Sequence, residues 1–280
     1  MKYLVTDLDG TLLNKDFEWD EFLDKALKKL LNSECELIIA TGRTLHGVKK
    51  CKALWEAPIY LIIMNGAIIL DKERNVIFTK ALPKDVVKSL LDILKEENLE
   101  FITSDGILCM LSKEEYINEY SKWDIWRKKV LNKKDSGYYY EYLNQFVFSV
   151  NEEDILQKEI LKINGLQLDN QRYQTLLCKL DKLKDKIINN SFADNVIEIT
   201  NPGITKDKAV FFLKDTFGWK QEDIYVFGDG GNDVELLNSF INSYAPQNAS
   251  IEAKKAAKSI IASNEEYGVI NKMLELVCSN

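Results

Sequence analysis

Four short motifs in this chain carry acidic, hydroxyl or basic side chains, and three of them also contain glycine. They are D-L-D-G-T at 7–11, T-G-R at 41–43, Lys206, and G-D-G-G-N-D at 228–233. Together they could supply up to four carboxylates, one ammonium, two hydroxyls and several glycine-rich backbone amides. Carboxylate oxygens are hard ligands that suit Mg²⁺. Lys206 and the loop amides could neutralise phosphoryl oxygens, which is the counter-charge that phosphoryl transfer requires.

Each motif also has an ordinary interpretation when it is taken alone. D-x-D-G-T could be a turn with solvated acids, and T-G-R is common turn chemistry. Lys206 has Lys208 two residues away, and lysines usually face solvent. G-D-G-G-N-D could be a plain loop between a strand and a helix, capped by Asn232 or Asp233. The order and placement of all four motifs together favour a functional site.

Short apolar runs stand directly before these polar positions and predict buried strands. The predicted strands are Lys2–Thr6, Leu37–Ala40, Ile59–Met64 and Ile224–Phe227. Helical spacing between them predicts helices at Trp19–Leu31, Thr44–Trp55 and Asp207–Phe217. Alternating strands and helices indicate a parallel sheet with helices on both faces, in which ligands bind at the carboxyl ends of the strands. We therefore expect Asp7, Thr41 and Asn65 to cluster in space.

The pattern changes from Pro83 onward, which predicts a second, inserted α/β domain at about 83–195. Its predicted elements are a helix at 83–94, a strand region at Glu100–Leu111, a strand at Gln145–Val150, and helices at Glu152–Ile163 and Thr175–Ile188. Val196–Thr200 is a further predicted strand, placed with the first domain. After Gly203 the alternation of helices and strands returns.

Composition narrows the function classes. The chain has 280 residues, 46% of them hydrophobic, and a formal net charge of −7, which disfavours a general nucleic-acid role. Its five scattered cysteines form no C-x-x-C pair, as expected of free thiols in a reducing compartment. The longest apolar run is too short to span a bilayer, and Asp7 and Asp9 stand where a signal peptide would be apolar. We expect a cytoplasmic protein. Because His46 is the only histidine, a histidine-rich metal site is excluded.

At this point the motifs resemble a known family. D-L-D-G-T-L-L, A-T-G-R-T, G-I-T-K (203–206) and G-D-G-G-N-D resemble, in order, the four motifs of the haloacid-dehalogenase-like (HAD) superfamily. M-N-G-A at 64–67 and the tail at 245–269 resemble the Cof-type phosphatases. The resemblance implies an α/β fold with a doubly wound parallel-sheet (Rossmann-like) core at 1–82 and 196–280. An α/β cap at 83–195 would be inserted after the third core strand.

The resemblance also implies roles for individual residues in a Mg²⁺-dependent phosphatase. Asp7 would be the nucleophile that forms an aspartyl phosphate, and Asp9 the general acid and then the base. The implied phosphate-binding residues are Leu8, Thr41, Gly42, Lys206 and Asn232, with the amides near Leu8 and Asp9 included. The implied metal residues are Asp7, Asp9 through its carbonyl, Asp229, and Asp233 directly or through water.

The implied substrates are sugar phosphates or similar small phosphomonoesters, handled by a monomer or homodimer without a nucleic-acid or membrane partner. One alternative is a phosphomutase of the phosphomannomutase type, which Asn248 and Asn264 in the tail disfavour. Another is a non-catalytic phosphometabolite-binding protein. A binding protein has no need of a nucleophile and an acid two residues apart, so Asp7 and Asp9 argue against it.

Three features have two interpretations each. Asp207 replaces the glycine that many relatives have after the third-motif lysine, and it could open a helix or weaken the charge of Lys206. Arg43 could point at the substrate or simply begin a helix. An aromatic group could line a substrate site or belong to the core and surface of the inserted domain; its members are Trp123, Trp126, Tyr138, Tyr139 and Tyr140.

Overall fold

The computed structural model describes the chain apart from residues 16–17, 120–142, 190–194 and 279–280. The described residues form two compact units. The first unit comprises residues 1–79 and 203–280, and the second comprises residues 80–202. The second unit is thus an insertion into the first, and it spans 80–202 where the sequence analysis expected about 83–195.

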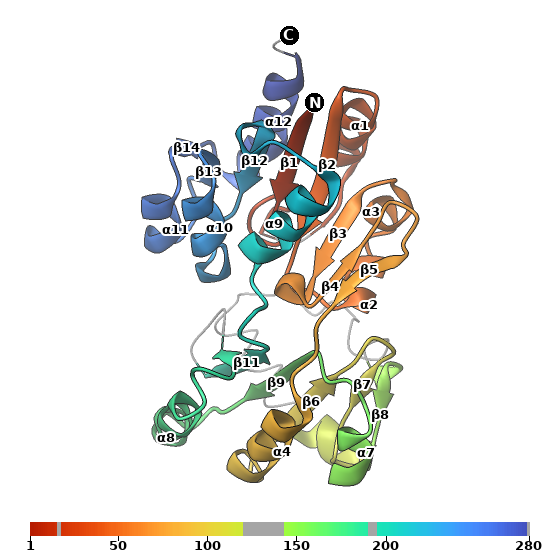
Figure 1. Cartoon of the computed structure of the whole chain (residues 1–280), viewed down its shortest axis with the longest axis vertical. Coiled ribbons are helices and arrows are strands. Elements are labelled where there is room, and N and C mark those ends of the chain that lie inside the picture. The colour runs from red at the N-terminus through yellow and green to blue at the C-terminus, as the bar shows by residue number, and fades with distance from the viewer. Residues whose placement is uncertain (16–17, 120–142, 190–194, 279–280) are drawn as a thin grey trace. The chain divides into compact units, whose positions relative to one another are not determined.

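An eight-stranded sheet organises the first unit (Figure 1). Its strands are β1 (Lys2–Thr6), β2 (Cys35–Ala40), β3 (Tyr60–Ile63), β4 (Ile68–Leu70), β5 (Val76–Thr79), β12 (Ile224–Phe227), β13 (Asn242–Pro246) and β14 (Ser259–Ile261). The strand order is β14-β13-β12-β1-β2-β3-β4-β5. The strands from β14 to β3 are parallel, and β4 and β5 continue the sheet as an antiparallel hairpin. The predicted α/β fold class is confirmed.

Helices follow most of these strands. They are α1 (Glu21–Leu31), α2 (Leu45–Lys49), α3 (Lys52–Glu56), α9 (Lys206–Phe217), α10 (Val234–Ser239), α11 (Ile251–Ala256) and α12 (Gly268–Cys278). Four 3₁₀ turns, η1 (Met64–Gly66), η2 (Gln221–Asp223), η3 (Gly231–Asp233) and η4 (Asn264–Glu266), complete the described part of this unit. The start of α1 is set by Asp20, whose carboxylate accepts from the Leu23 amide at 2.9 Å. Gly218 ends α9 in the left-handed conformation, with φ of 68°.

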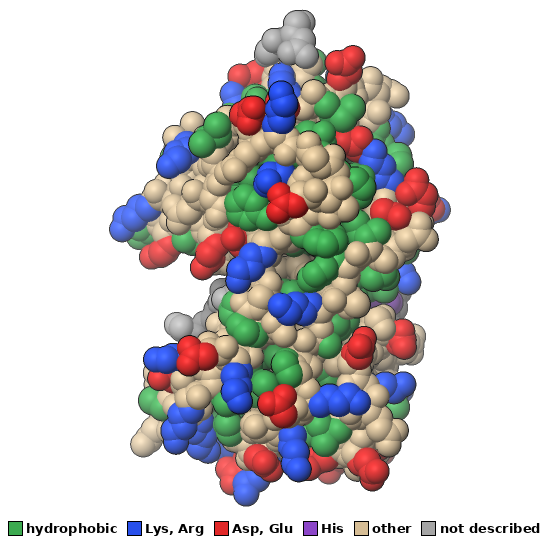
Figure 2. Space-filling view, viewed as in Figure 1, with side chains coloured by type: hydrophobic (Ala, Val, Ile, Leu, Met, Phe, Trp, Pro, Cys, Tyr) green, Lys and Arg blue, Asp and Glu red, His purple; other side chains and the backbone are tan. Residues whose placement is uncertain are grey.

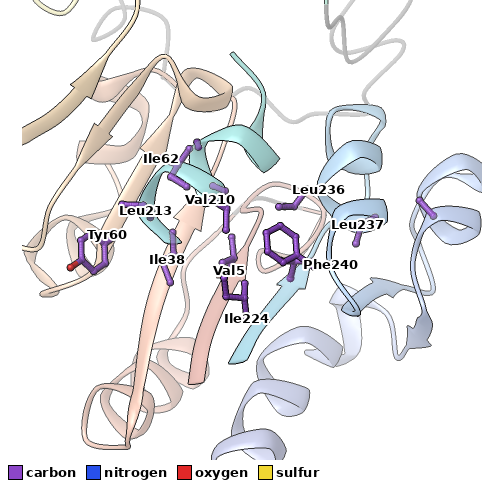
Figure 3. Close-up of a cluster of buried hydrophobic side chains, with 14 of the residues drawn as sticks. Val5, Ile38, Tyr60, Ile62, Val210, Leu213, Ile224, Leu236, Leu237 and Phe240 are labelled. Carbon is purple, nitrogen blue, oxygen red and sulfur yellow. The ribbon is translucent and has the colours of Figure 1, made fainter. Parts of the chain in front are cut away.

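One face of the sheet packs against α9 and α10 in a continuous apolar core (Figure 3). Val5 of β1 and Ile38 of β2 are fully buried there, opposite Val210 and Leu213 of α9. Each such side chain stabilises the fold by about 1.5–3 kcal/mol. Alternate strand residues point to the other face, where α1 lies against β2 and against α12. Helices therefore cover both faces of the parallel part of the sheet, as parallel sheets require.

The second unit has its own sheet and its own core. The strands are β6 (Leu99–Ile102), β7 (Ile107–Leu108), β8 (Phe146–Val147), β9 (Lys162–Leu166), β10 (Ile188–Asn189) and β11 (Val196–Thr200), and the named helices are α4 (Lys84–Ile93), α7 (Glu152–Leu156) and α8 (Asn170–Asp181). The strand order is β10-β11-β9-β6-β7-β8, antiparallel except between β7 and β8. Leu90, Phe101 and Ile163 are buried in one apolar cluster shared by this sheet and its helices.

The structure differs from the sequence expectations in four places. The predicted helix Thr175–Ile188 is α8, which spans Asn170–Asp181, and Ile188 begins the strand β10. The predicted helix Thr44–Trp55 is two short helices, because Cys51 leaves the helical region with φ of −84° and ψ of 82°. The predicted helix Glu152–Ile163 ends at Leu156, and β9 begins at Lys162. The segment Ile160–Ile163, apolar except for Lys162, is too short to distinguish a buried helix from a buried strand. Val196–Thr200 is the predicted strand, but it pairs with β9 and so belongs to the second unit.

Charged side chains of both signs are interspersed over the face of the molecule that Figure 2 shows. They form no large basic patch on that face. In the described part of the chain, no helix combines the length and the apolar character that crossing a membrane requires.

Candidate active site

Four polar segments meet at one edge of the first sheet. Asp7 follows β1, Thr41 follows β2, Asn65 follows β3, and Asp229 follows β12. These strands are consecutive neighbours in the sheet and all run in parallel, so their carboxyl ends share one edge. This is the edge at which open parallel sheets bind ligands.

Lys206 joins two of the predicted acids. Its ammonium donates to Asp7 Oδ1 and to Asp233 Oδ1, both at 2.6 Å. The lysine begins α9 and is 1% exposed, so its charge lies inside the protein next to these carboxylates. The second oxygen of Asp233 accepts from the amides of Asp229 and Gly230, each at 3.0 Å. Asp233 therefore holds the lysine and shapes the loop that carries Asp229.

Asp7, Asp229 and Asp233 form a convergent acidic group. Each offers one carboxylate oxygen, and the three oxygens lie within 4.8 Å of one another. Thr11 donates its hydroxyl to Asp229 Oδ1 at 2.5 Å, so the D-G-T triplet also orients the acid of the fourth motif. Gly10 has φ of 81°, and a Cβ there would lie 2.5 Å from Asp229 Oδ2. The motif thus requires glycine for both its backbone conformation and this close approach.

Burial and crowding disfavour negative charge in this group. Burial raises the pKa of Asp7 well above its ordinary value; Lys206 opposes that rise, while the neighbouring acids add to it. Burial also raises the pKa of Asp229 to about 6, against the opposing hydrogen bond from Thr11 and with a contribution from Asp233. Although burial alone disfavours the ammonium of Lys206, Asp233 and Asp7 raise its pKa. Lys206 is therefore a permanent cation, while the acids have too little counter-charge.

The residues present fit a divalent cation. Three carboxylates beside one ammonium leave two negative charges when all four groups are ionised. A buried excess of this size is costly unless a cation compensates it. Asp7 and Asp229 would hold the ion, with hard oxygen ligands of the kind that Mg²⁺ prefers. Both oxygens of Asp233 are already engaged, which suits a role beside the ion rather than on it.

Asp9 lies apart from the acidic group and is held by Arg43. Arg43 Nε donates to one Asp9 oxygen at 2.7 Å, and its Nη2 donates to the other at 2.6 Å. Such a bidentate pair fixes the carboxylate more firmly than a single bond does. The sequence left two interpretations of Arg43, a contact with the substrate and an ordinary helix start. The structure shows neither, because the Arg43 guanidinium binds the carboxylate of Asp9.

Asn65 connects the second and fourth motifs. Its side-chain oxygen accepts from Asn232 Nδ2 at 3.0 Å, and its backbone N–H donates to the Thr41 carbonyl at 2.9 Å. Asn65 adopts a left-handed conformation with φ of 57°, and its Oδ1 lies 3.2 Å from the position of a Cβ on Gly42. The sequence analysis expected Asn65 to lie near Asp7 and Thr41 and found it within M-N-G-A, but it gave Asn65 no role in binding Asn232. The signal in the sequence is the Asn65-Gly66 pair, because asparagine before glycine favours a left-handed turn.

The remaining predicted residues lie as follows. The Leu8 side chain is fully buried, so only its backbone could face a phosphate. Thr41 is buried, and its hydroxyl accepts from the Arg43 amide at 3.2 Å. Asp207 lies in the first turn of α9, where a negative charge favours the helix. The aromatic group from Trp123 to Tyr140 lies outside the described residues.

Comparisons with known proteins identify the family of the chain. The profile of the haloacid dehalogenase-like hydrolases matches residues 4–273. The chain is 28% identical over 284 residues to the 5-amino-6-(5-phospho-D-ribitylamino)uracil phosphatase YwtE of Bacillus subtilis, with 96% of each chain covered.

Two solved structures share the fold. A haloacid dehalogenase-like hydrolase from B. subtilis superposes with a TM-score of 0.81 at 21% identity, covering 99% of this chain and 100% of that one. The HAD subclass IIB sugar phosphatase BT4131 gives 0.74 at 23% identity, with 99% of each chain covered. The predicted family is thereby confirmed: the chain belongs to the haloacid dehalogenase-like hydrolases, as a phosphatase of the Cof type.

Proposed function

We propose that this chain is a Mg²⁺-dependent cytoplasmic phosphatase that hydrolyses small phosphomonoesters, sugar phosphates or similar metabolites, through an aspartyl phosphate on Asp7. The observation that carries the proposal is the buried Lys206, bound to both Asp7 and Asp233, with Asp229 in the same acidic group. The proposed nucleophile, a fixed cation and excess negative charge thus lie together at the carboxyl-terminal edge of the parallel strands. The five free cysteines fit a reducing compartment.

The proposed reaction has two steps. An oxygen of Asp7 attacks phosphorus, the bond from phosphorus to the leaving oxygen breaks, and Asp9 gives a proton to that oxygen. Asp9 then takes a proton from water, which attacks phosphorus, releases inorganic phosphate and restores the Asp7 carboxylate. Bound Mg²⁺ would supply counter-charge to the phosphoryl oxygens. Because Arg43 holds both oxygens of Asp9, that pair must loosen when Asp9 acts as an acid.

The phosphate-binding groups are proposed from their positions. Lys206 would hold one phosphoryl oxygen from the side of α9, and Thr41 and the Gly42 amide would hold others from the end of β2. Asn232 donates from Nδ2 to Asn65 Oδ1, which orients its side chain. It would bind a phosphoryl oxygen from the loop of the fourth motif. The amides of Leu8 and Asp9 follow the nucleophile directly and would complete the set. Asp9 would also offer its backbone carbonyl to Mg²⁺.

The substrate class is proposed from two similar proteins. The name of the Bacillus relative describes a phosphorylated ribitylamino compound, and BT4131 is named a sugar phosphatase. Both names indicate a phosphate ester on a polyhydroxylated carbon chain. We propose the same leaving-group class here, with the second unit serving as the cap.

The test is release of inorganic phosphate from a panel of sugar and polyol phosphates. We expect turnover with Mg²⁺, none with EDTA, and none with Asp7→Asn. The matched control is Asp215→Asn, an exposed acid on α9 in the same unit, which we expect to keep full activity. No turnover of any compound, including a mutase assay with a sugar bisphosphate, would contradict the proposal.

A further inference from the structure

Two asparagines in the C-terminal part of the first unit bind the backbone of the first motif. Asn248 Nδ2 donates to the carbonyl of Gly10 at 2.7 Å. Asn264 Nδ2 donates to the carbonyl of Leu13 at 2.9 Å, and the backbone N–H of Asn264 donates to Asn248 Oδ1 at 3.0 Å. The three bonds form a continuous chain from one side of the D-L-D-G-T-L-L loop to the other.

The same segment also holds the fourth motif. The amide of Ser250 donates to the carbonyl of Asp229 at 2.9 Å. The turn between β13 and α11 therefore binds the loop of Asp7 through a side chain and the loop of Asp229 through its backbone. We call Asn248, Ser250 and Asn264 the tail brace.

The exposure of Asn248 makes its geometry informative. An exposed side-chain amide is normally solvated and free to change rotamer, and holding it in one position costs conformational entropy. Asn248 is exposed, yet both ends of its amide are bound to distant parts of the chain. Asn264, which orients it, is buried at 4% exposure.

The contacts of Gly10 and Thr11 show what the brace positions. Gly10 lies directly against the Asp229 carboxylate, and Thr11 donates its hydroxyl to that same carboxylate at 2.5 Å. By binding the Gly10 carbonyl, Asn248 fixes the separation between the Asp7 loop and Asp229. Mg²⁺ demands near-ideal geometry at about 2.0–2.1 Å, so its affinity is sensitive to that separation.

We infer that Asn248, oriented by Asn264, is a positioning residue for the divalent-cation site formed by Asp7 and Asp229. In this role it acts through the backbone of Gly10 and not as a ligand of the ion. This inference deepens the proposed function and rests on it, because it assumes the cation site between the two loops.

The test is Mn²⁺ binding to the substrate-free full-length protein, measured from the electron paramagnetic resonance signal of free Mn²⁺, with Mg²⁺ as competitor. Loss of one neutral hydrogen bond predicts that Asn248→Ala raises the dissociation constants of both ions by roughly three- to tenfold. The matched control is Asn242→Ala. Asn242 Nδ2 donates to the Glu222 carbonyl at 2.8 Å, at the opposite end of β13 from the site.

We expect Asn242→Ala to lower the melting temperature about as much as Asn248→Ala but to leave the cation affinity within twofold of wild type. Unchanged affinity in Asn248→Ala, or equal weakening in both variants, would overturn the inference. If the wild type binds no Mn²⁺, or if Asp229→Asn binds it equally well, the cation site of the proposed function fails, and the inference fails with it. Unchanged affinity in Asn248→Ala, or equal weakening in both variants, contradicts only the positioning role of Asn248 and leaves the cation site intact. The two failures are therefore distinguishable.

Discussion

Each unit of the protein buries a lysine against an acid, but the surroundings of the two lysines differ. In the second unit, Lys162 on β9 pairs with Glu198 on the neighbouring β11, with side chains 3% and 12% exposed. In the first unit, Lys206 is bound to Asp7 and Asp233, and Asp229 is a third acid in the same group. Among the residues that the structure describes, only this group brings three such ligands together.

The difference separates an ion pair that joins two strands from the proposed reactive site. Lys162 and Glu198 bring opposite charges together across the neighbouring strands β9 and β11, which serves a structural role. One cation among three acids is under-compensated and is stabilised when another cation binds. A buried lysine alone is therefore weak evidence of function, and the charge imbalance around it is the stronger evidence.

The largest expected effect is on Lys206. Lys206→Ala removes the fixed cation from the proposed phosphoryl site and from Asp7, so we expect kcat to fall about 10³-fold. Steady-state phosphate release from a sugar phosphate measures the change. Lys208→Ala, two residues further along α9, is the matched control, and we expect it to stay within threefold of wild type. Comparable losses in the two variants would remove the contrast between the lysines.

The second prediction concerns the pair in the other unit. Lys162→Met removes the ammonium that pairs with the buried carboxylate of Glu198, and we expect the free energy of unfolding to fall by about 3 kcal/mol. The double variant Lys162→Met/Glu198→Leu should recover most of that loss, because both charges of the pair are removed together. Urea denaturation followed by circular dichroism measures both variants. A double variant less stable than Lys162→Met would show that the charges, rather than their pairing, are what this sheet needs.

The third prediction tests how Arg43 acts. If it positions Asp9, Arg43→Ala should reduce kcat about 30-fold on an alkyl phosphate, whose leaving oxygen needs a proton. On p-nitrophenyl phosphate, whose leaving group departs without one, we expect a change of less than about threefold. The ratio of the two effects is the measurement. In an Asp9→Asn background, Arg43→Ala should have little further effect on the alkyl substrate. An equal loss on both substrates would instead indicate a direct role in phosphate binding.

The smallest expected effect is stabilisation by the cation itself. At a Mg²⁺ concentration ten times its dissociation constant, binding to the folded state adds about 1.4 kcal/mol to stability. We expect the melting temperature to rise by a few degrees in wild type and to stay constant in Asp229→Asn. The Lys162→Met variant should keep the full rise, because its substitution lies in the other unit. A rise of the same size in Asp229→Asn would place the stabilising ion elsewhere.

Much of the fold and the family follow from local patterns. The strands Lys2–Thr6, Ile224–Phe227 and Val196–Thr200 coincide with β1, β12 and β11, because short apolar runs before turns mark buried strands. The wrong predictions lie where local patterns are ambiguous. The short segment Ile160–Ile163 could not show that α7 ends at Leu156 and that a strand follows. The partner of Val196–Thr200 depends on residues far away along the chain.

The candidate site divides in the same way. The residue types and order of the four motifs, read from the sequence alone, predicted which side chains gather at the strand ends and which family the chain belongs to. Only the tertiary structure decided that Lys206 reaches across 199 residues of sequence to Asp7, that Arg43 holds Asp9, and that Asn248 binds Gly10. Motifs record which groups the chemistry requires, whereas hydrogen-bond partners depend on how strands pair and how helices pack, and those are properties of the whole folded chain.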